Sequence, residues 1–294
     1  MTERIEKETI CTPPEEKQYE ELSITDNFLF CKIMEKNPSL CRELLEVILG
    51  IEIRDIIFAG KEQTVGITPK GKSVRLDVYV ADDAGTVYDL EMQVASNKNL
   101  PKRTRYYQGI MDLNLLEKGA DYRELGRSYV IFICTFDYFK SGLPVYTFTN
   151  RCSEFRELEL GDDTVKIFIN PDGDTTGLSE DMTAFLRYLK GEQTQNNALV
   201  GRMAHEVLAA RSCEEWRVEY MTLMMELRER YNEGREEGRQ LGMKQGREQG
   251  IRVFVLDKME ENVPEEKIIE KLQKGFHLSE EKARYYYERV VSER

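Results

Sequence analysis

Residue types that build common metal and redox sites are scarce in this sequence. The 294-residue chain has two histidines and six cysteines, and no two cysteines have the Cys-x-x-Cys spacing of zinc sites. This scarcity argues against a zinc centre and favours reduced, mostly structural thiols in a cytoplasm. The two histidines, His205 and His277, fall in helical patterns far from the acidic residues discussed below, so we do not expect them to be catalytic.

The chain also lacks a long hydrophobic run and an excess of positive charge. The longest apolar run, residues 129–136, suits a buried strand and is far shorter than the roughly 20 residues that span a bilayer. The N-terminus is charged from its third residue, so we expect neither a signal peptide nor a membrane partner. A net charge of −12 excludes nucleic-acid binding through global positive charge, although a local basic strip remains compatible with it.

The pattern of apolar residues predicts an α/β domain at residues 23–190. Residues 1–22 are polar, acidic and carry Pro13-Pro14, which predicts a mobile leader. Helices are expected at 26–36 and at 38–49, the second between Pro38 and Gly50. The expected elements that follow are strands at 54–59, 73–81 and 86–95, a helix at 102–117, strands at 129–136, 145–148 and 165–169, and a short helix at 181–189. This order predicts a mixed sheet flanked by helices.

Residues 191–294 read as a helical extension. A helix is expected at 198–231 and a helix pair at 264–291, and between them a glycine recurs at every fourth position from 234 to 250. Glycine costs about 1 kcal/mol per residue relative to alanine in a helix, so this repeat argues against a stable isolated helix. Two alternatives remain, a marginal helix that orders against a partner and a semi-flexible spacer. The extension is the candidate surface for a homo-oligomer.

The strands at 73–81 and 86–95 form a predicted hairpin. A three-residue loop ending at a left-handed Gly85 would pair Asp82 with Thr86. Counting back from that pair places Asp77 directly opposite Glu91.

Two carboxylates that face each other across a hairpin repel unless a cation lies between them. Asp89 and Gln93 share the face of Glu91, and no histidine or cysteine is near. These hard oxygen ligands favour Mg²⁺ or Mn²⁺, which can polarise a phosphoryl oxygen and lower the pKa of an attacking water. The alternative is an ordinary exposed polar face of a hairpin.

A basic stretch follows the hairpin. Residues 92–111 contain no acidic residue but carry four basic ones, Lys98, Lys102, Arg103 and Arg105. Tyr106 and Tyr107 accompany these basic residues in the sequence. Such a strip beside the carboxylates could contact a phosphate backbone. The alternative is a solvated helix face. Tyr106, with Ile110 and Leu113 at helical spacing, is expected in the core.

The sequence resembles the PD-(D/E)XK nuclease family transposases, the recombination-promoting nuclease group. The resemblance rests on RLDVYV, DLEMQV and the run KRTRYYQGIMDLNLLEKGADYRELGRSYVIFICTFDYF, and it extends over residues 22–170. It implies a restriction-endonuclease-like core in which Asp77 and Glu91 hold Mg²⁺, with the backbone carbonyl of Met92 as a further ligand. Asp26 matches a family position on the first helix, where N-capping explains an aspartate equally well.

The resemblance also implies roles for the residues around this pair. Gln93 stands where the superfamily commonly has a water-activating lysine, and it matches the family's own Glu-x-Gln form. Arg103 and Tyr107, four residues apart on one helix, would hold a phosphate or brace the site.

We therefore expect a cytoplasmic, Mg²⁺-dependent DNA endonuclease that acts through Asp77, Glu91 and Gln93. Recombination would follow from strand breakage, since nothing in the sequence resembles the three-acid core of other transposases. The alternative is a catalytically weak or inactive module that binds DNA or protein with the same fold. The missing lysine and the net negative charge favour that alternative, and the intact Asp77–Glu91 pair opposes it.

Overall fold

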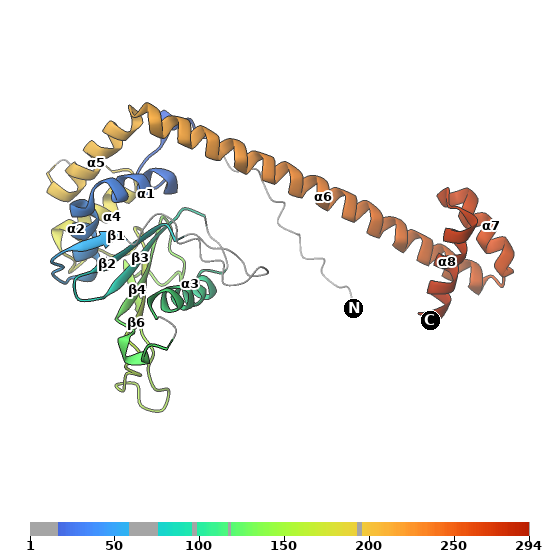
Figure 1. Cartoon of the computed structure of the whole chain (residues 1–294), viewed down its shortest axis with the longest axis horizontal. Coiled ribbons are helices and arrows are strands. Elements are labelled where there is room, and N and C mark those ends of the chain that lie inside the picture. The colour runs from blue at the N-terminus through green and yellow to red at the C-terminus, as the bar shows by residue number, and fades with distance from the viewer. Residues whose placement is uncertain (1–16, 59–75, 96–98, 117–118, 193–195, 294) are drawn as a thin grey trace. The chain divides into compact units, whose positions relative to one another are not determined.

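The short β-rich runs between residues 54 and 169 form one six-stranded sheet (Figure 1). This computed structural model describes residues 17–58, 76–95, 99–116, 119–192 and 196–293. The strands are β1 (Ile56–Phe58), β2 (Val78–Asp82), β3 (Val87–Gln93), β4 (Ser128–Cys134), β5 (Val145–Phe148) and β6 (Thr164–Ile169), in the spatial order β1-β2-β3-β4-β6-β5. Strands β3, β4 and β6 run parallel, and the other pairings are antiparallel, so the predicted mixed sheet is confirmed.

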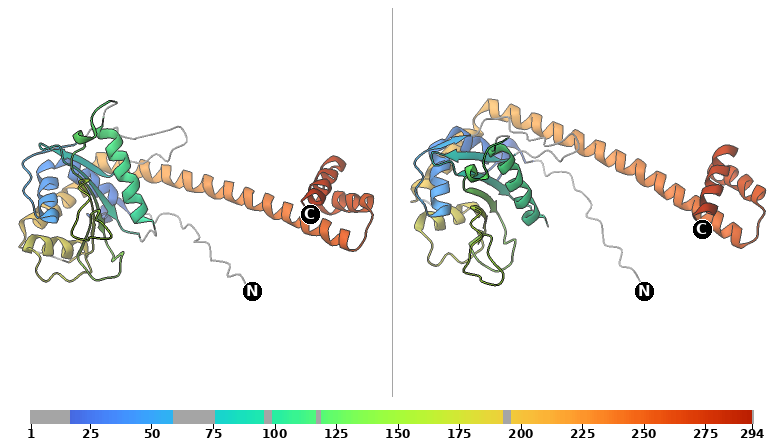
Figure 2. Two further views of the ribbon diagram at one scale, coloured as in Figure 1. Left: turned by 90° about the horizontal axis from the view of Figure 1, so that it is seen from below. Right: turned by 60° about the horizontal axis from the view of Figure 1, so that its bottom comes forward.

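Helices cover both faces of this sheet, as predicted for an α/β fold. Helices α1 (Asn27–Lys36) and α2 (Pro38–Leu49) contact β1, β2 and β3, and α3 (Leu100–Leu115) lies on the opposite face against β4 (Figures 1 and 2). Helix α3 is the crossover that a parallel β3–β4 pair requires. Helices α4 (Glu180–Leu189) and α5 (Ala198–Arg211) pack against α1 and α2 as an outer layer.

The first two helices begin and end where the sequence predicts. Asp26 is the N-cap residue of α1, and Pro38 occupies the first turn of α2. Gly50 ends α2 in a left-handed conformation with φ of 66°, which glycine adopts without a steric penalty.

The buried face of α3 differs from the expected one. Ile110 is buried as expected, but Tyr106 and Leu113 are exposed and Tyr107 and Met111 are buried, so the expectation of a core position for Tyr106 was wrong. The sequence offers two apolar rows on this helix, and the row that contains Tyr107 is the one that packs on Phe132 of β4. Periodicity alone does not distinguish them, because the choice depends on the aromatic residues of the sheet.

Part of the predicted leader is packed. Tyr19, in the short 3-10 helix η1 (Tyr19–Glu21), is 4% exposed, and its hydroxyl donates a hydrogen bond of 2.7 Å to the carbonyl of Ala210 in α5. Leu22 is also buried, so the end of the segment predicted as a leader packs on the first unit through Tyr19 and Leu22. Residues 1–16 lie outside the described residues. Because α5 packs on this unit, the unit runs from Lys17 to Met221, beyond the predicted boundary at residue 190.

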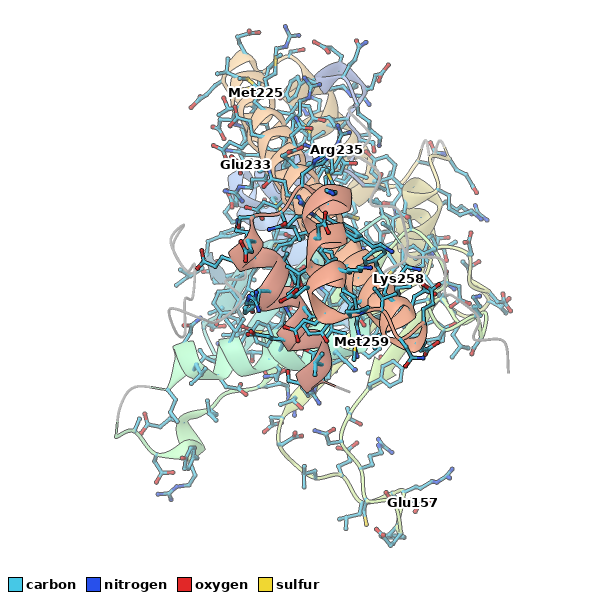
Figure 3. All side chains as sticks on the ribbon, turned by 90° about the vertical axis from the view of Figure 1, so that its right-hand side faces the viewer. Glu157, Met225, Glu233, Arg235, Lys258 and Met259 are labelled. Carbon is cyan, nitrogen blue, oxygen red and sulfur yellow. The ribbon has the colours of Figure 1, made fainter. Side chains whose placement is uncertain are left out.

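The second compact unit contains, among the described residues, 222–293. Helix α6 (Glu214–Glu260) crosses into it from the first unit and is continuous through the glycine repeat, so of the two alternatives the repeat is helical and not an irregular spacer. The predicted helix at 198–231 is instead interrupted at Ser212 and Cys213. Lys258 and Met259 mark the C-terminal end of α6 (Figure 3).

A small apolar core holds the end of α6 against α7 (Glu265–Phe276) and α8 (Glu280–Ser292), which confirms the predicted C-terminal helix pair. Its buried members are Ile251, Val255, Ile268, Ile269, Leu272, Ala283 and Val290. This packing stabilises the helix that follows the glycines, since tertiary contacts commonly outweigh intrinsic helix propensity. Among the helices of the described ranges, none has the length and apolar character needed to cross a membrane.

We expect Gly126→Ala to destabilise the first unit. A Cβ atom at position 126 would lie 2.3 Å from the backbone oxygen of Gly85 in the β2–β3 turn, so backbone would have to move. Overpacking of this kind costs about 1–3 kcal/mol, measurable as a lower free energy of unfolding in urea.

The matched control is Gly109→Ala in α3, where a new Cβ meets nothing within 4 Å. Replacing a mid-helix glycine by alanine should raise stability by about 0.5–1 kcal/mol. Equal effects of the two substitutions would contradict this description of the turn.

Candidate active site

The β2–β3 hairpin has the predicted register. Gly85 adopts φ of 82°, and the backbone N–H of Asp82 donates to the carbonyl of Thr86 at 2.9 Å. The pairs from Ala81↔Val87 to Val78↔Leu90 continue this register toward the start of β2. One step further, Asp77 and Glu91 are opposite each other, as the sequence predicts.

The two carboxylates of this pair are held by the backbone of the partner strand. The Asp77 N–H donates to Oε1 of Glu91 at 3.1 Å, and the Met92 N–H donates to Oδ2 of Asp77 at 3.3 Å. Glu91 is 2% exposed, and Asp77 is half-buried. The acids are therefore fixed at the edge of the core, so the alternative of an ordinary exposed hairpin face does not hold for Glu91.

Asp89 adds a third carboxylate that was not among the predicted site residues. It is fully buried, and neither of its carboxylate oxygens has a hydrogen-bond partner in the described part of the chain. Burial first, and then the charge of Asp77, raise the pKa of Asp89 well above its ordinary value. Burial and the charges of Asp89 and Asp77 likewise raise the pKa of Glu91. The alternation of side chains along β3 was the sequence signal that places Asp89 on the face of Glu91. Its burial, however, depends on α3, which packs over that face.

Arg103 of α3 supplies the positive charge at this face. Its Nη2 donates to Oε2 of Glu91 at 3.0 Å and to the hydroxyl of Tyr107 at 2.7 Å, and its Nη1 donates to Oε1 of Gln93 at 2.7 Å. The guanidinium also lies 5.1 Å from the ring centroid of Phe132. Burial lowers the pKa of Arg103, but the bond to Tyr107 and the charge of Glu91 raise it by more. The group is therefore a permanent cation that braces the acids.

Gln93 is held at both ends of its amide. Its Nε2 donates to the carbonyl of Ala95 at 2.5 Å, while its Oε1 accepts from Arg103. The side chain is 8% exposed, so it has one fixed orientation beside Glu91.

The first helix contributes Asn27 and not Asp26. The Nδ2 of Asn27 donates to Oδ1 of Asp77 at 3.0 Å. The carboxylate of Asp26 instead accepts from the Ser23 N–H at 2.8 Å and from Lys17 Nζ at 2.7 Å, so Asp26 occupies the N-cap position of α1 without a side-chain hydrogen bond to the helix. No residue pattern singled out Asn27 in advance.

The predicted basic strip is divided. Arg103 turns toward the acids, and Tyr107 is buried beside it. Lys102 and Arg105 are exposed on the first turns of α3 and make no ion pair with any described residue. Lys98 lies outside the described residues. The strip therefore divides into Arg103, which contacts Glu91 and Gln93, and Lys102 and Arg105, which face solvent.

The residues present suit a hard divalent cation. Asp77, Asp89, Glu91 and Gln93 offer oxygen donors only, and Arg103 balances one of the three acidic groups. Both oxygens of the buried Asp89 lack a hydrogen-bond partner among the described residues, which leaves them open to a further donor or ligand. Among the described residues no three histidine, cysteine or acidic side chains are gathered closely enough to form a ligand set by themselves. A cation here would therefore depend on Asp77, Glu91 and a non-acidic ligand.

Residues 26–169 match the family model of the PD-(D/E)XK nuclease family transposases. The match covers the whole six-stranded sheet and every site residue described above, and it confirms the resemblance seen in the sequence. No curated protein and no solved structure matches the chain.

We expect Asp89→Asn to raise the stability of the metal-free protein by about 1 kcal/mol or more at pH 8, because it removes a buried negative charge that repels Asp77. A carboxyl whose pKa is raised by folding favours the folded state at low pH, and this contribution is lost as the pH rises through the raised value. The advantage of the variant should therefore grow from pH 5 to pH 8 in thermal unfolding with EDTA.

The control is Asp83→Asn in the exposed hairpin turn, where stability should change by less than about 0.5 kcal/mol. A destabilised Asp89→Asn protein at pH 8 would show that Asp89 has a partner that stabilises its charge.

Proposed function

Because residues 26–169 belong to the PD-(D/E)XK nuclease family transposases, we propose that this chain is a Mg²⁺-dependent DNA endonuclease. The observation that carries the proposal is the Asp77–Glu91 pair, fixed across the hairpin beside the buried Asp89. Such concentrated carboxylates destabilise a fold unless a cation uses them. Mn²⁺ would fit the same oxygen donors.

Asp77, Glu91 and the backbone carbonyl of Met92 would hold the ion. A bound ion supplies Lewis acidity toward a phosphoryl oxygen and lowers the pKa of a water molecule. Asn27 orients the Asp77 carboxylate, and Arg103 orients that of Glu91, so both ligands are preorganised. Fixed ligands reduce the reorganisation that accompanies reaction.

Gln93 and Arg103 together would replace the lysine that is common in the superfamily. Gln93 carries no charge, but its fixed amide oxygen can accept a second hydrogen bond, from a water molecule, and so hold that water in one orientation. Arg103 brings a permanent positive charge to the same place, where charge develops on a phosphate under attack. Water orientation and charge stabilisation would thus reside in two side chains.

A DNA-binding module without catalysis is the second candidate. Gln93 favours it, because both ends of its amide already have protein partners and it supplies no positive charge. Lys102 and Arg105 would support DNA contact under either function.

We expect Asp77→Ala and Glu91→Ala each to reduce Mg²⁺-dependent nicking of supercoiled plasmid by at least about a hundredfold, because each removes an ion ligand. Calorimetric titration of Mg²⁺ should show weakened binding in both variants. Asp83→Ala, in the exposed turn of the same hairpin, is the matched control and should retain wild-type cleavage and binding.

Full cleavage by either variant would exclude this site. Intact Mg²⁺ binding and DNA binding without nicking in the wild-type protein would favour the binding module.

Substitutions at position 93 test whether Gln93 takes over the role of the lysine that is common in the superfamily. Gln93→Ala should lower the cleavage rate by roughly tenfold to a hundredfold while leaving Mg²⁺ affinity nearly unchanged, because Gln93 is proposed to orient water and not the ion. Gln93→Lys should need more Mg²⁺ and should not exceed the wild-type rate at saturating Mg²⁺, since the added ammonium group would repel both the ion and Arg103. An unchanged rate in Gln93→Ala would remove Gln93 from the mechanism.

A further inference from the structure

A pocket of about 400 Å³ opens between α3 and the strands β5 and β6. Its lining combines the rings of Phe139, Phe148 and Phe168 with the side chains of Arg105, Lys166 and Asn150. This size falls in the range of small-molecule sites, and none of these residues except Arg105 entered the site described above.

The three phenylalanines form one cluster. The ring centroids of Phe139 and Phe148 are 5.0 Å apart, those of Phe139 and Phe168 are 5.0 Å apart, and those of Phe148 and Phe168 are 5.9 Å apart. Phe168 is buried as the floor of the cluster, whereas Phe148 remains 43% exposed. An exposed ring at the mouth of a pocket is a stacking surface for a flat ligand.

Two cations border the rings. Arg105 is exposed on α3 and makes no ion pair with any described residue. Lys166 is partly buried, and burial lowers its pKa although Asp162 and Asp112 act in the opposite direction. Its Nζ donates to the hydroxyl of Thr164 at 2.7 Å and has further donors to offer. Aromatic rings beside positive groups suit a ligand that joins a flat ring to an anion, which is the chemistry of a nucleotide.

The pocket lies on the sheet face that carries the acids. Glu91, Phe132 and Phe168 are register partners on the adjacent strands β3, β4 and β6. Neighbouring strands are about 4.8 Å apart, so the backbones at Glu91 and Phe168 are about 10 Å apart. The Phe132 and Phe168 rings stack at 5.6 Å, and Arg103 lies over Phe132, so an aromatic row links the pocket to the acids.

We propose that this pocket binds an unpaired nucleobase of a DNA strand, with Arg105 and Lys166 on the adjoining phosphates. The inference rests on the proposed function for the identity of the ligand, and it adds a preference for single-stranded or locally opened DNA. A base can enter such a pocket only after it leaves the stack and loses its pair, which is cheapest where the strand is already single.

The test compares two probes of equal charge by fluorescence anisotropy in EDTA, where no cleavage occurs. One probe is a ten-nucleotide oligothymidylate, and the other is an abasic oligomer of the same length. We expect the wild-type protein to bind the thymidylate at least about fivefold more tightly, the lower end of what stacking of one base contributes. Phe148→Ala should reduce this preference to less than about twofold.

Phe155→Ala is the matched aromatic control, since Phe155 is 59% exposed and outside the pocket. It belongs to the β5–β6 loop, in which Glu157 lies far from the sheet (Figure 3). Arg105→Ala should weaken binding of both probes equally and reduce the salt slope by about 1, whereas the exposed control Arg156→Ala should change neither.

A wild-type protein without base preference, or an unchanged preference in Phe148→Ala, would overturn the proposal. The plasmid assay separates this failure from that of the nuclease proposal. Nicking without base preference would support the nuclease proposal and contradict the pocket proposal. Base preference without nicking would support the pocket proposal and contradict the nuclease proposal.

Discussion

The site depends on how Arg103 balances the carboxylates that β3 buries. Asp89 and Glu91 alternate onto one face of β3, and Asp77 of the opposite strand faces them. The fold can tolerate this repulsion only because α3 brings Arg103 within 3.0 Å of Glu91 and shields the face from water. The repulsion that remains among Asp77, Asp89 and Glu91 adds to burial in raising the pKa of both buried acids, Asp89 and Glu91.

This balance gives the β3–α3–β4 crossover a second role besides joining parallel strands. The helix must pack its Tyr107 side on Phe132 in order to aim Arg103 at Glu91 and Gln93. The same packing leaves Arg105 on the far side of the helix, at the mouth of the aromatic pocket. The rotation of α3 about its own axis therefore determines both that Arg103 faces the acids and that Arg105 borders the pocket.

The hairpin was predictable from the sequence, and its surroundings were not. Turn length and a left-handed Gly85 determine the register, so the Asp77–Glu91 pairing follows from local rules. The burial of Asp89 and the direction of Arg103 depend on which row of α3 meets the sheet, a choice that the helical period leaves open. Asn27 reaches Asp77 from a helix fifty residues earlier, and no local pattern encodes such a contact.

Replacement of the common lysine by glutamine has a physical reason in this geometry. A lysine at position 93 would place its ammonium group beside Arg103, whose guanidinium lies 2.7 Å from Oε1 of Gln93. Two adjacent cations would repel each other and compete for Glu91, whereas the glutamine amide accepts from the arginine and stays neutral. Because Arg103 lies beside position 93, a neutral hydrogen-bond acceptor fits there better than a second cation. The glutamine is therefore compatible with a working site and does not by itself indicate a site that has lost its activity.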